Sequence, residues 1–196
     1  SSGTWSLMGI ENEQAICTPE SRQQNFTNEG GYEYRFRYLK NIMGLWMIQS
    51  ARHEWKDAYS FAKLCEMAEE ENDFPSRVDV NDACFMAPES MIEAIREFCR
   101  RTGQAEPETV GQTAAVIYQS LAESYADTVG QIERITGRTF PAINIVGGGS
   151  NAEYLNQLTA DKSDRCVYAG PSEATAIGNL AVQMVKDGLF QTLEEV

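Results

Sequence analysis

The sequence predicts an α/β domain, because its last third alternates between strand-like and helix-like segments. Residues 142–146 form an apolar run that ends at three glycines, which is typical of a buried strand. A helical pattern over about 151–159, a short strand over 166–169 and a last helix over 173–186 follow it. This order indicates a layer of parallel strands that is covered by helices.

The first part of the chain predicts strands followed by short helices. Side chains alternate between polar and apolar over residues 1–16 and again over 34–39, and this period of two favours strands. Apolar residues then recur at helical spacing over 45–55 and over 61–68. The acidic run 69–73 follows the second of these helices, and we interpret it as a solvated surface loop.

The middle of the chain predicts two more helices. One covers 88–102, and the longest begins after a capping box of Thr109 with Gln112 and ends at Gly137. Apolar side chains recur along this second helix every three or four positions, over about 40 Å at 1.5 Å per residue. We find no internal repeat and no second domain boundary, so we expect residues 1–196 to form a single domain.

The composition excludes two classes of partner. With 29 acidic and 16 basic side chains and a net charge of -13, the chain would repel a nucleic-acid backbone. No apolar run approaches the roughly 20 residues that cross a bilayer, so we expect no membrane association. The five cysteines are odd in number and scattered, and only one histidine is present, which indicates neither a disulfide framework nor a metal site. We therefore expect a reducing, cytoplasmic location.

The glycine turn over 147–149 is the most informative motif. Glycine has no Cβ, so a base, a ribose or a phosphate can approach the main chain closely there. In parallel sheets ligands bind beyond the carboxyl ends of the strands, where we expect the turn at Gly3 and Thr4 to emerge as well. The two turns could face one ligand, although a plain loop between a strand and a helix explains the glycines equally well.

Three polar positions could contact such a ligand. Thr4 lies in a Ser-Ser-Gly-Thr segment whose hydroxyls suit phosphate oxygens, and a frayed terminus is the alternative. Asn41 and Gln49 carry neutral amides that can bind the hydroxyls of a sugar or a ribose. A helix cap for Asn41 and an ordinary surface position for Gln49 are the alternatives.

The other candidates for chemistry are weaker. His53 could act as a general base, but no carboxylate and serine accompany it, so we interpret it as a structural residue. Four aromatic residues could stack on a sugar, although their periodicity favours a place in the core. These residues are Tyr32, Tyr34, Tyr38 and Trp46. The chain therefore predicts binding chemistry without catalytic chemistry.

Five stretches in order together resemble the C-terminal domain of the FGGY carbohydrate kinase family. They are Ser-Ser-Gly-Thr-Trp-Ser-Leu-Met-Gly at 1–9, Asn-Glu-Gly-Gly at 28–31, Lys-Asn-Ile-Met-Gly-Leu-Trp at 40–46, Ile-Val-Gly-Gly-Gly-Ser at 145–150 and Ala-Gly-Pro-Ser-Glu-Ala at 169–174. The match runs from the first residue to the last. The resemblance implies an actin-like, ribonuclease H-like ATPase domain, with a mixed sheet flanked by helices.

The resemblance also implies an activity and residue roles. The family members that this chain resembles transfer the γ-phosphate of ATP, with Mg²⁺, to the 1-hydroxyl of L-rhamnulose in rhamnose catabolism. Carried over by position, Thr4 resembles the threonine of a phosphate loop and Gly148 the glycine of the adenosine loop. Gln49 resembles a further nucleotide contact, and Asn41 resembles a sugar-binding asparagine.

The resemblance places the rest of the active site upstream of Ser1. The first phosphate loop, most of the sugar pocket and the proton-accepting aspartate lie in the N-terminal kinase domain of the same protein, which is the expected partner. We therefore assign no catalytic residue to this chain, and we expect the chain alone to be inactive. Two alternatives stay open: another ketose or polyol kinase of the family, and a nucleotide-binding module of the same fold without catalysis.

Overall fold

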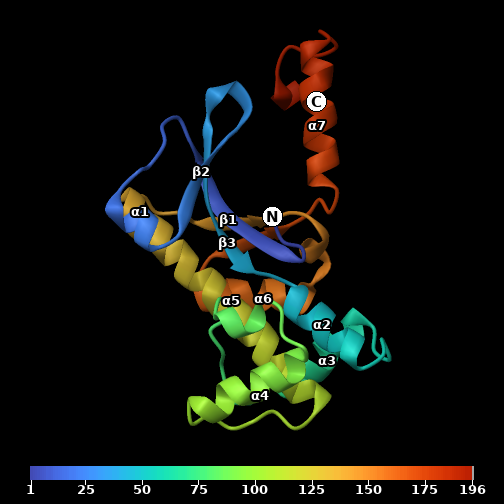
Figure 1. Cartoon of the computed structure of the whole chain (residues 1–196). Helices are drawn as coiled ribbons and strands as arrows, with labels where there is room; N and C mark the ends of the chain where they lie inside the picture. Colours follow the sequence, from blue (N-terminus) through green and yellow to red (C-terminus); the bar gives the residue numbers. More distant parts are fainter. Residues whose placement is uncertain (196) are drawn as a thin grey trace.

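The computed structural model describes residues 1–195 (Figure 1). The strands are β1 (Trp5–Asn12), β2 (Phe26–Gly30), β3 (Phe36–Met43), β4 (Ala142–Ile145) and β5 (Cys166–Ala169). The helices are α1 (Pro19–Gln23), α2 (Trp46–Glu54), α3 (Phe61–Glu70), α4 (Met91–Arg101), α5 (Val110–Thr136), α6 (Glu153–Ser163) and α7 (Ala174–Lys186). The predicted α/β class and every predicted helix and strand are present. None of the described helices is long and apolar enough to cross a membrane.

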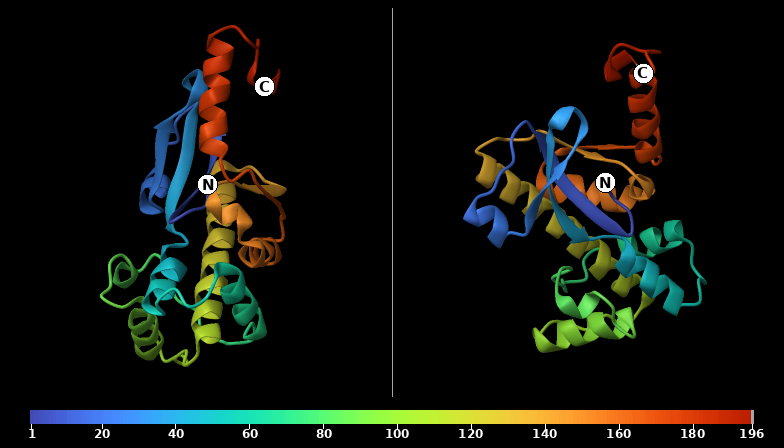
Figure 2. Two further views of the ribbon diagram at one scale, coloured as in Figure 1. Left: turned by 90° about the vertical axis from the view of Figure 1, so that its right-hand side faces the viewer. Right: turned by 45° about the horizontal axis from the view of Figure 1, so that its top comes forward.

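The strands pair in both directions, as a mixed arrangement requires. β1, β3 and β2 form an antiparallel sheet in that order, with Leu7 opposite Asn41. β4 and β5 form the predicted parallel pair, with Ile143 opposite Val167. Over the described residues these are two separate sheets and not one continuous sheet. In Figure 2 both lie beside the upper part of α5.

Helix α5 is the centre of the core. The hydroxyl of Thr109 accepts a hydrogen bond from the Gln112 amide at 3.1 Å, and Gly137 ends the helix with a φ of 65°, so both predicted ends are confirmed. Ile117 and Leu121 are fully buried along its apolar stripe. Helices α3 and α6 pack along α5, and α2 and α4 lie near its lower end in Figure 1. This packing fixes α3 and α6 relative to each other.

The sequence pattern does not predict two elements of the structure, α1 and β2. Thr18 caps α1, and its Oγ1 accepts from the Ser21 amide at 3.1 Å. β2 is an edge strand whose exposed positions are polar, so it shows no clear alternation. Phe26 in β2 stacks on the buried Tyr38 with ring centroids 4.8 Å apart, which holds this strand on the sheet.

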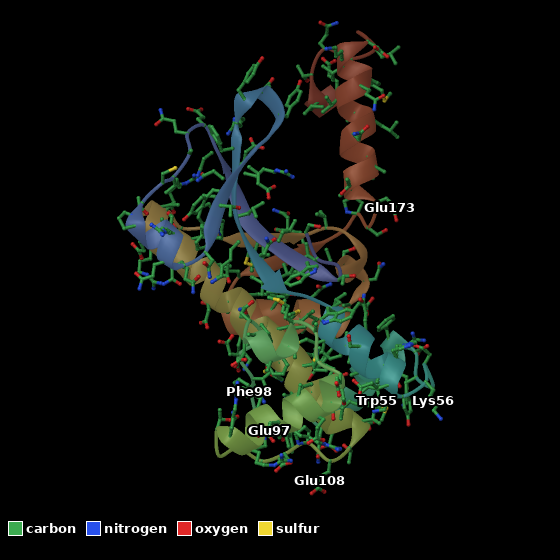
Figure 3. All side chains as sticks on the ribbon, viewed as in Figure 1. Trp55, Lys56, Glu97, Phe98, Glu108 and Glu173 are labelled. Carbon is green, nitrogen blue, oxygen red and sulfur yellow. The ribbon has the colours of Figure 1, made fainter. Side chains whose placement is uncertain are left out.

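Helix α7 stands away from the rest of the chain in Figures 1 and 2, and Figure 3 marks its start at Glu173. Its period predicts an apolar inner face, but Ile177 and Leu180 are 50% and 59% exposed, and Ala181 is the buried residue of the helix. That expectation of a buried face is wrong for the described chain. The helix has the amphipathic pattern but lacks a surface to cover.

Candidate functional site

A large cavity of about 1060 Å³ lies among α2, α3, α6 and the glycine turn. Its lining includes Gly3, Gln49 and Gly148. Two of the residues singled out from the sequence therefore line one cavity, and the glycine beside Thr4 lines it with them. The cavity has the size of a site for a small organic ligand.

The three glycines of the turn differ in what they face. A Cβ on Gly147 would lie 2.8 Å from the Ser2 carbonyl oxygen, and Gly147 has a φ of +90°. A Cβ on Gly149 would lie 2.0 Å from Ser2 Oγ. A Cβ on Gly148 would meet nothing within 4 Å and would point into open space. The fold itself therefore requires glycine at 147 and 149, whereas at 148 it leaves the main chain bare toward the cavity.

The turn at Gly3 and Thr4 is fixed against the start of α2. The carbonyl of Gly3 accepts from the Leu45 amide at 2.9 Å, and the carbonyl of Thr4 accepts from the Trp46 amide at 3.0 Å. The hydroxyl of Thr4 is exposed and donates to Gln49 Oε1 at 3.3 Å. Since Gln49 lines the cavity, Thr4 lies directly beside this lining.

The walls of the cavity combine apolar and acidic side chains. Leu45, Ile48, Phe61 and Leu158 supply apolar surface. Glu66, Glu69, Glu153 and Asp161 supply carboxylates. No lysine or arginine belongs to this lining among residues 1–195. Such walls suit a flat, uncharged group that carries amino or hydroxyl groups, and they repel a polyanion from the interior.

The titratable groups at the back of the cavity are held in their neutral forms. Burial raises the pKa of the Cys65 thiol, and it raises the pKa of the Tyr118 phenol. Burial also raises the pKa of Tyr154, whose hydroxyl donates to Asn72 Oδ1 at 3.1 Å. Neutral thiol and phenol groups are poor nucleophiles and poor bases at pH 7. These thiol and phenol groups therefore supply neither a nucleophile nor a base to the cavity.

The remaining sequence candidates lie outside this lining. Asn41 is exposed on β3 and is not among the cavity residues. His53 is exposed, with its Nδ1 3.5 Å from Asp57 Oδ2, and it also lies outside. Tyr38 is buried, as its pattern predicts, whereas Tyr34 is 96% exposed, so a place in the core is wrong for Tyr34.

Helices α3 and α6 supply walls that motif reasoning did not single out. Phe61 and Glu69 come from α3, and Glu153 and Tyr154 come from the start of α6. The interpretation of 69–73 as a solvated loop is therefore wrong in part: Glu69 belongs to the last turns of α3, and Glu69 and Asn72 line the cavity. The one sequence signal that could have pointed to this wall of the cavity is the acidic run itself, which directly follows an amphipathic pattern.

Comparisons with known proteins agree on a single family. The FGGY family of carbohydrate kinases, C-terminal domain, matches residues 1–186. The chain is 50% identical over 195 residues to a rhamnulokinase of Halalkalibacterium halodurans, and 52% identical over 185 residues to one of Oceanobacillus iheyensis. These matches cover 100% and 94% of this chain but only 42% and 39% of the two relatives.

A solved structure supports the same fold. The xylulose kinase from Bifidobacterium adolescentis superimposes with a TM-score of 0.54 at 13% sequence identity. The match covers 85% of this chain and 32% of that one. At this identity the likeness concerns the fold alone, and it agrees with an actin-like domain of a sugar kinase.

Proposed function

This chain belongs to the FGGY family of carbohydrate kinases as a C-terminal domain, and we propose that it forms the nucleotide-binding half of an ATP-dependent kinase for L-rhamnulose. The relatives named rhamnulokinase are more than twice as long as the chain, so an N-terminal kinase domain of the same protein is the proposed partner. The observation that carries the proposal is the bare main chain of Gly148 in the lining of a large cavity.

We propose that the nucleoside of ATP lies on Gly148, where a side chain would occupy its space. The apolar surfaces of Ile48 and Phe61 suit the base, and the carboxylates on α3 and α6 suit the amino and hydroxyl groups of adenosine. The same carboxylates repel phosphates, so the triphosphate is directed outward, toward Thr4. There the Thr4 hydroxyl can exchange its hydrogen bond to Gln49 Oε1 for one to a phosphate oxygen, and this donor adds no charge.

Magnesium would shield the phosphate charge during the transfer. Among residues 1–195 no cluster of three histidine, cysteine, aspartate or glutamate side chains could hold a metal ion. The described residues therefore do not fit a dedicated magnesium site of their own. We assign this chain the orientation of the nucleotide, and we place the proton-accepting aspartate in the upstream domain.

The proposed sugar-binding residue, Asn41, lies outside the cavity. Asn41 is exposed on β3, at a position opposite Leu7 of β1. Its amide can donate to and accept from sugar hydroxyls. We propose that this face of the sheet is turned toward the upstream domain and that the sugar is held between the two.

A substrate panel on the full-length protein tests the function. With ATP and Mg²⁺, we expect transfer to L-rhamnulose at about 1–100 per second, with the phosphate on O1 as seen by NMR of the product. A higher kcat/KM for another ketose or for a polyol would assign the chain to a different kinase of the family. ATP binding without transfer to any sugar would favour the non-catalytic module. Assay of a cytoplasmic fraction against secreted and membrane fractions tests the proposed location.

A further inference from the structure

Trp5 differs from the other two tryptophans of the chain in its exposure to solvent. Trp46 and Trp55 pack against the main core, whereas Trp5 is 48% exposed at the start of β1. An exposed indole offers a flat apolar surface and one N–H donor to whatever covers it. The packing of the core therefore does not explain a tryptophan at this position.

The side chain of Trp5 lies on the face of the sheet that is turned away from α5. The next side chain along β1, Ser6, is buried, and its Oγ lies 2.6 Å from the hydroxyl of Tyr125 on α5. Successive side chains of a strand point to opposite faces of the sheet. Trp5 and Leu7 therefore point away from α5. The left view of Figure 2 shows the sheet to one side of this helix.

Asn41 lies on the same face of the sheet as Trp5. Its neighbour Lys40 points toward α5, where its Nζ donates to Gln131 Oε1 at 3.0 Å, so the exposed Asn41 points the other way. Asn41 is directly opposite Leu7 of β1. A diagonal neighbour, two residues further along the paired strand, lies about 7–8 Å away, within reach of an aromatic side chain. Trp5 is that neighbour, so its indole and the Asn41 amide border one patch.

Trp5 also lies between the two proposed ends of the substrate site. Thr4, the proposed phosphate contact, directly precedes it, and Leu7, opposite Asn41, is two residues further on. The strand from Thr4 to Leu7 spans about 10 Å, at about 3.3 Å per residue. A sugar that receives a phosphate near Thr4 and is held by Asn41 therefore passes over Trp5.

The chemistry of this patch matches a carbohydrate. A ketose has hydroxyl groups at its edges and C–H groups on its faces, so it fits an apolar surface that lies beside hydrogen-bonding groups. The indole supplies the apolar surface, and the Asn41 amide both donates and accepts. We propose that Trp5 is a substrate-binding residue whose indole stacks on the C–H face of the sugar while Asn41 binds its hydroxyl groups. This inference rests on the proposed sugar contact of Asn41.

The position of the patch favours the sugar over the upstream domain as its occupant. The hydroxyl of Thr4 donates to Gln49, which lines the proposed nucleotide cavity, so a phosphate held at Thr4 lies within one residue of Trp5. The acceptor hydroxyl has to reach that phosphate. A protein surface packed on Trp5 would block the path from the phosphate to Asn41.

Two substitutions of Trp5 in the full-length protein test the proposal, with the sugar that the parent protein phosphorylates best. Trp5→Ala removes the stacking surface, so the KM for this sugar should rise at least about tenfold, while the KM for ATP stays within about twofold of the parent value. Trp5→Phe keeps a flat apolar ring and should retain most of the affinity for the sugar. The matched control is Tyr34→Ala, which removes an exposed aromatic side chain before the far end of β3 and should change neither KM.

Tryptophan fluorescence measures the contact without catalysis. The sugar, added without ATP, should change the emission of the parent protein. In Trp5→Phe, which still binds the sugar, the part of the change that Trp5 supplies should be absent. Thermal unfolding should be nearly the same in the parent and in both variants, since Trp5 lies outside the buried core.

The outcomes separate this inference from the proposed function. A normal KM for the sugar in Trp5→Ala, or an equal rise in the KM for ATP, would overturn the inference and leave the proposed kinase activity in place. A lower melting temperature with a normal KM would also overturn it, because the upstream domain would then be the occupant. If the parent prefers a ketose other than L-rhamnulose, the proposed substrate is wrong, and a raised KM for that ketose in Trp5→Ala still supports the role of Trp5.

Discussion

The hydroxyl of Thr4 donates to Gln49 Oε1 at 3.3 Å, across 45 positions of sequence. The contact joins the turn before β1 to the first turn of α2, and it holds Thr4 against Gln49, which lines the large cavity. Because Gln49 accepts this bond through its oxygen, its amide nitrogen stays available to a ligand. The pair thus couples the phosphate end of the proposed site to its nucleoside end.

The Thr4→Val substitution in the full-length enzyme tests the role of the hydroxyl. Valine keeps the size and the β-branching, so the melting temperature should not change. If the hydroxyl contacts the γ-phosphate mainly in the transition state, kcat should fall about 10- to 100-fold, for a bond of about 1.5–3 kcal/mol, with little change in the KM for ATP. The control Thr4→Ser keeps the hydroxyl and should retain most of the activity. An unchanged kcat in Thr4→Val would show that Thr4 is an ordinary turn residue with no part in the transfer.

The three neighbouring glycines allow a matched comparison. Gly148→Val should raise the KM for ATP at least about tenfold and leave the melting temperature nearly unchanged, because its Cβ meets nothing within 4 Å. Gly149→Ala should instead destabilise the fold by about 1–3 kcal/mol, since its Cβ would lie 2.0 Å from Ser2 Oγ. Steady-state kinetics and thermal unfolding of both variants distinguish a role in ligand binding from a role in the fold. Equal destabilisation in both would remove the argument for a ligand at Gly148.

Substitution of Asn41 should weaken sugar binding without weakening nucleotide binding. Asn41→Ala removes an exposed amide outside the cavity, so the KM for L-rhamnulose should rise about tenfold, while the KM for ATP and the melting temperature stay close to those of the parent. Asn41→Asp, which keeps an acceptor but loses the donor, measures which half of the amide matters. A parallel rise in both KM values would contradict the proposed division of roles.

Local signals in the sequence were sufficient for much of the fold. The capping hydroxyl of Thr109 and the left-handed Gly137 define α5 because each satisfies main-chain groups at a helix end. The parallel pair of β4 and β5 follows from the alternation of strand and helix at the end of the chain. The glycine turn could also be singled out from the sequence, because three successive glycines are a local signal, although Ser2, which requires glycine at 147 and 149, is distant in the sequence.

The parts that escaped prediction depend on long-range packing. Phe61 and Glu69 line the cavity because α3 packs along α5 beside α6, and no pattern within α3 contains that information. Tyr34 continues an alternating strand pattern, but it occupies a turn with a φ of 60° and points into solvent. Ile177 has the period of a buried face, yet the described residues leave that face without a partner.

The chain from Ser1 to Val196, purified alone, should transfer no phosphate to L-rhamnulose. Its cavity offers neutral thiol and phenol groups, and the carboxylates in it belong to the proposed nucleoside site, so no general base faces a sugar hydroxyl. The measurement is product formation with ATP and Mg²⁺, with circular dichroism to verify that the sample is folded. Turnover at about one per second that persists after further purification would show that a catalytic base lies within this chain.

The environment of Glu133 predicts that the contacts at the end of α5 lose stability in acid. Its Oε1 accepts from the Phe140 amide at 2.9 Å and from Arg165 Nη2 at 3.1 Å, so it ties α5 to the segments before β4 and β5. The hydrogen bond from the Phe140 amide, followed by the bond from Arg165, lowers the pKa of this carboxyl. A lowered pKa in the folded state means that the ionised carboxylate stabilises the fold at pH values above the ordinary glutamate pKa of about 4.3. This contribution is lost as the pH falls through the lower, folded-state value.

The comparison with Glu133→Gln isolates that contribution, because glutamine keeps an acceptor for the Phe140 amide and loses only the charge. At pH 7 this domain of the variant should melt about 2–4 °C below that of the parent, for a loss of about 1 kcal/mol in a domain of roughly 150–250 residues. The gap should shrink as the pH falls below the ordinary glutamate pKa of about 4.3, and it should vanish once the pH lies below the lowered pKa of folded Glu133, since glutamine does not titrate. Thermal unfolding of the full-length pair from pH 7 to pH 3 measures this gap. A gap that stays constant over this range would assign the effect to packing and not to the ionised carboxylate.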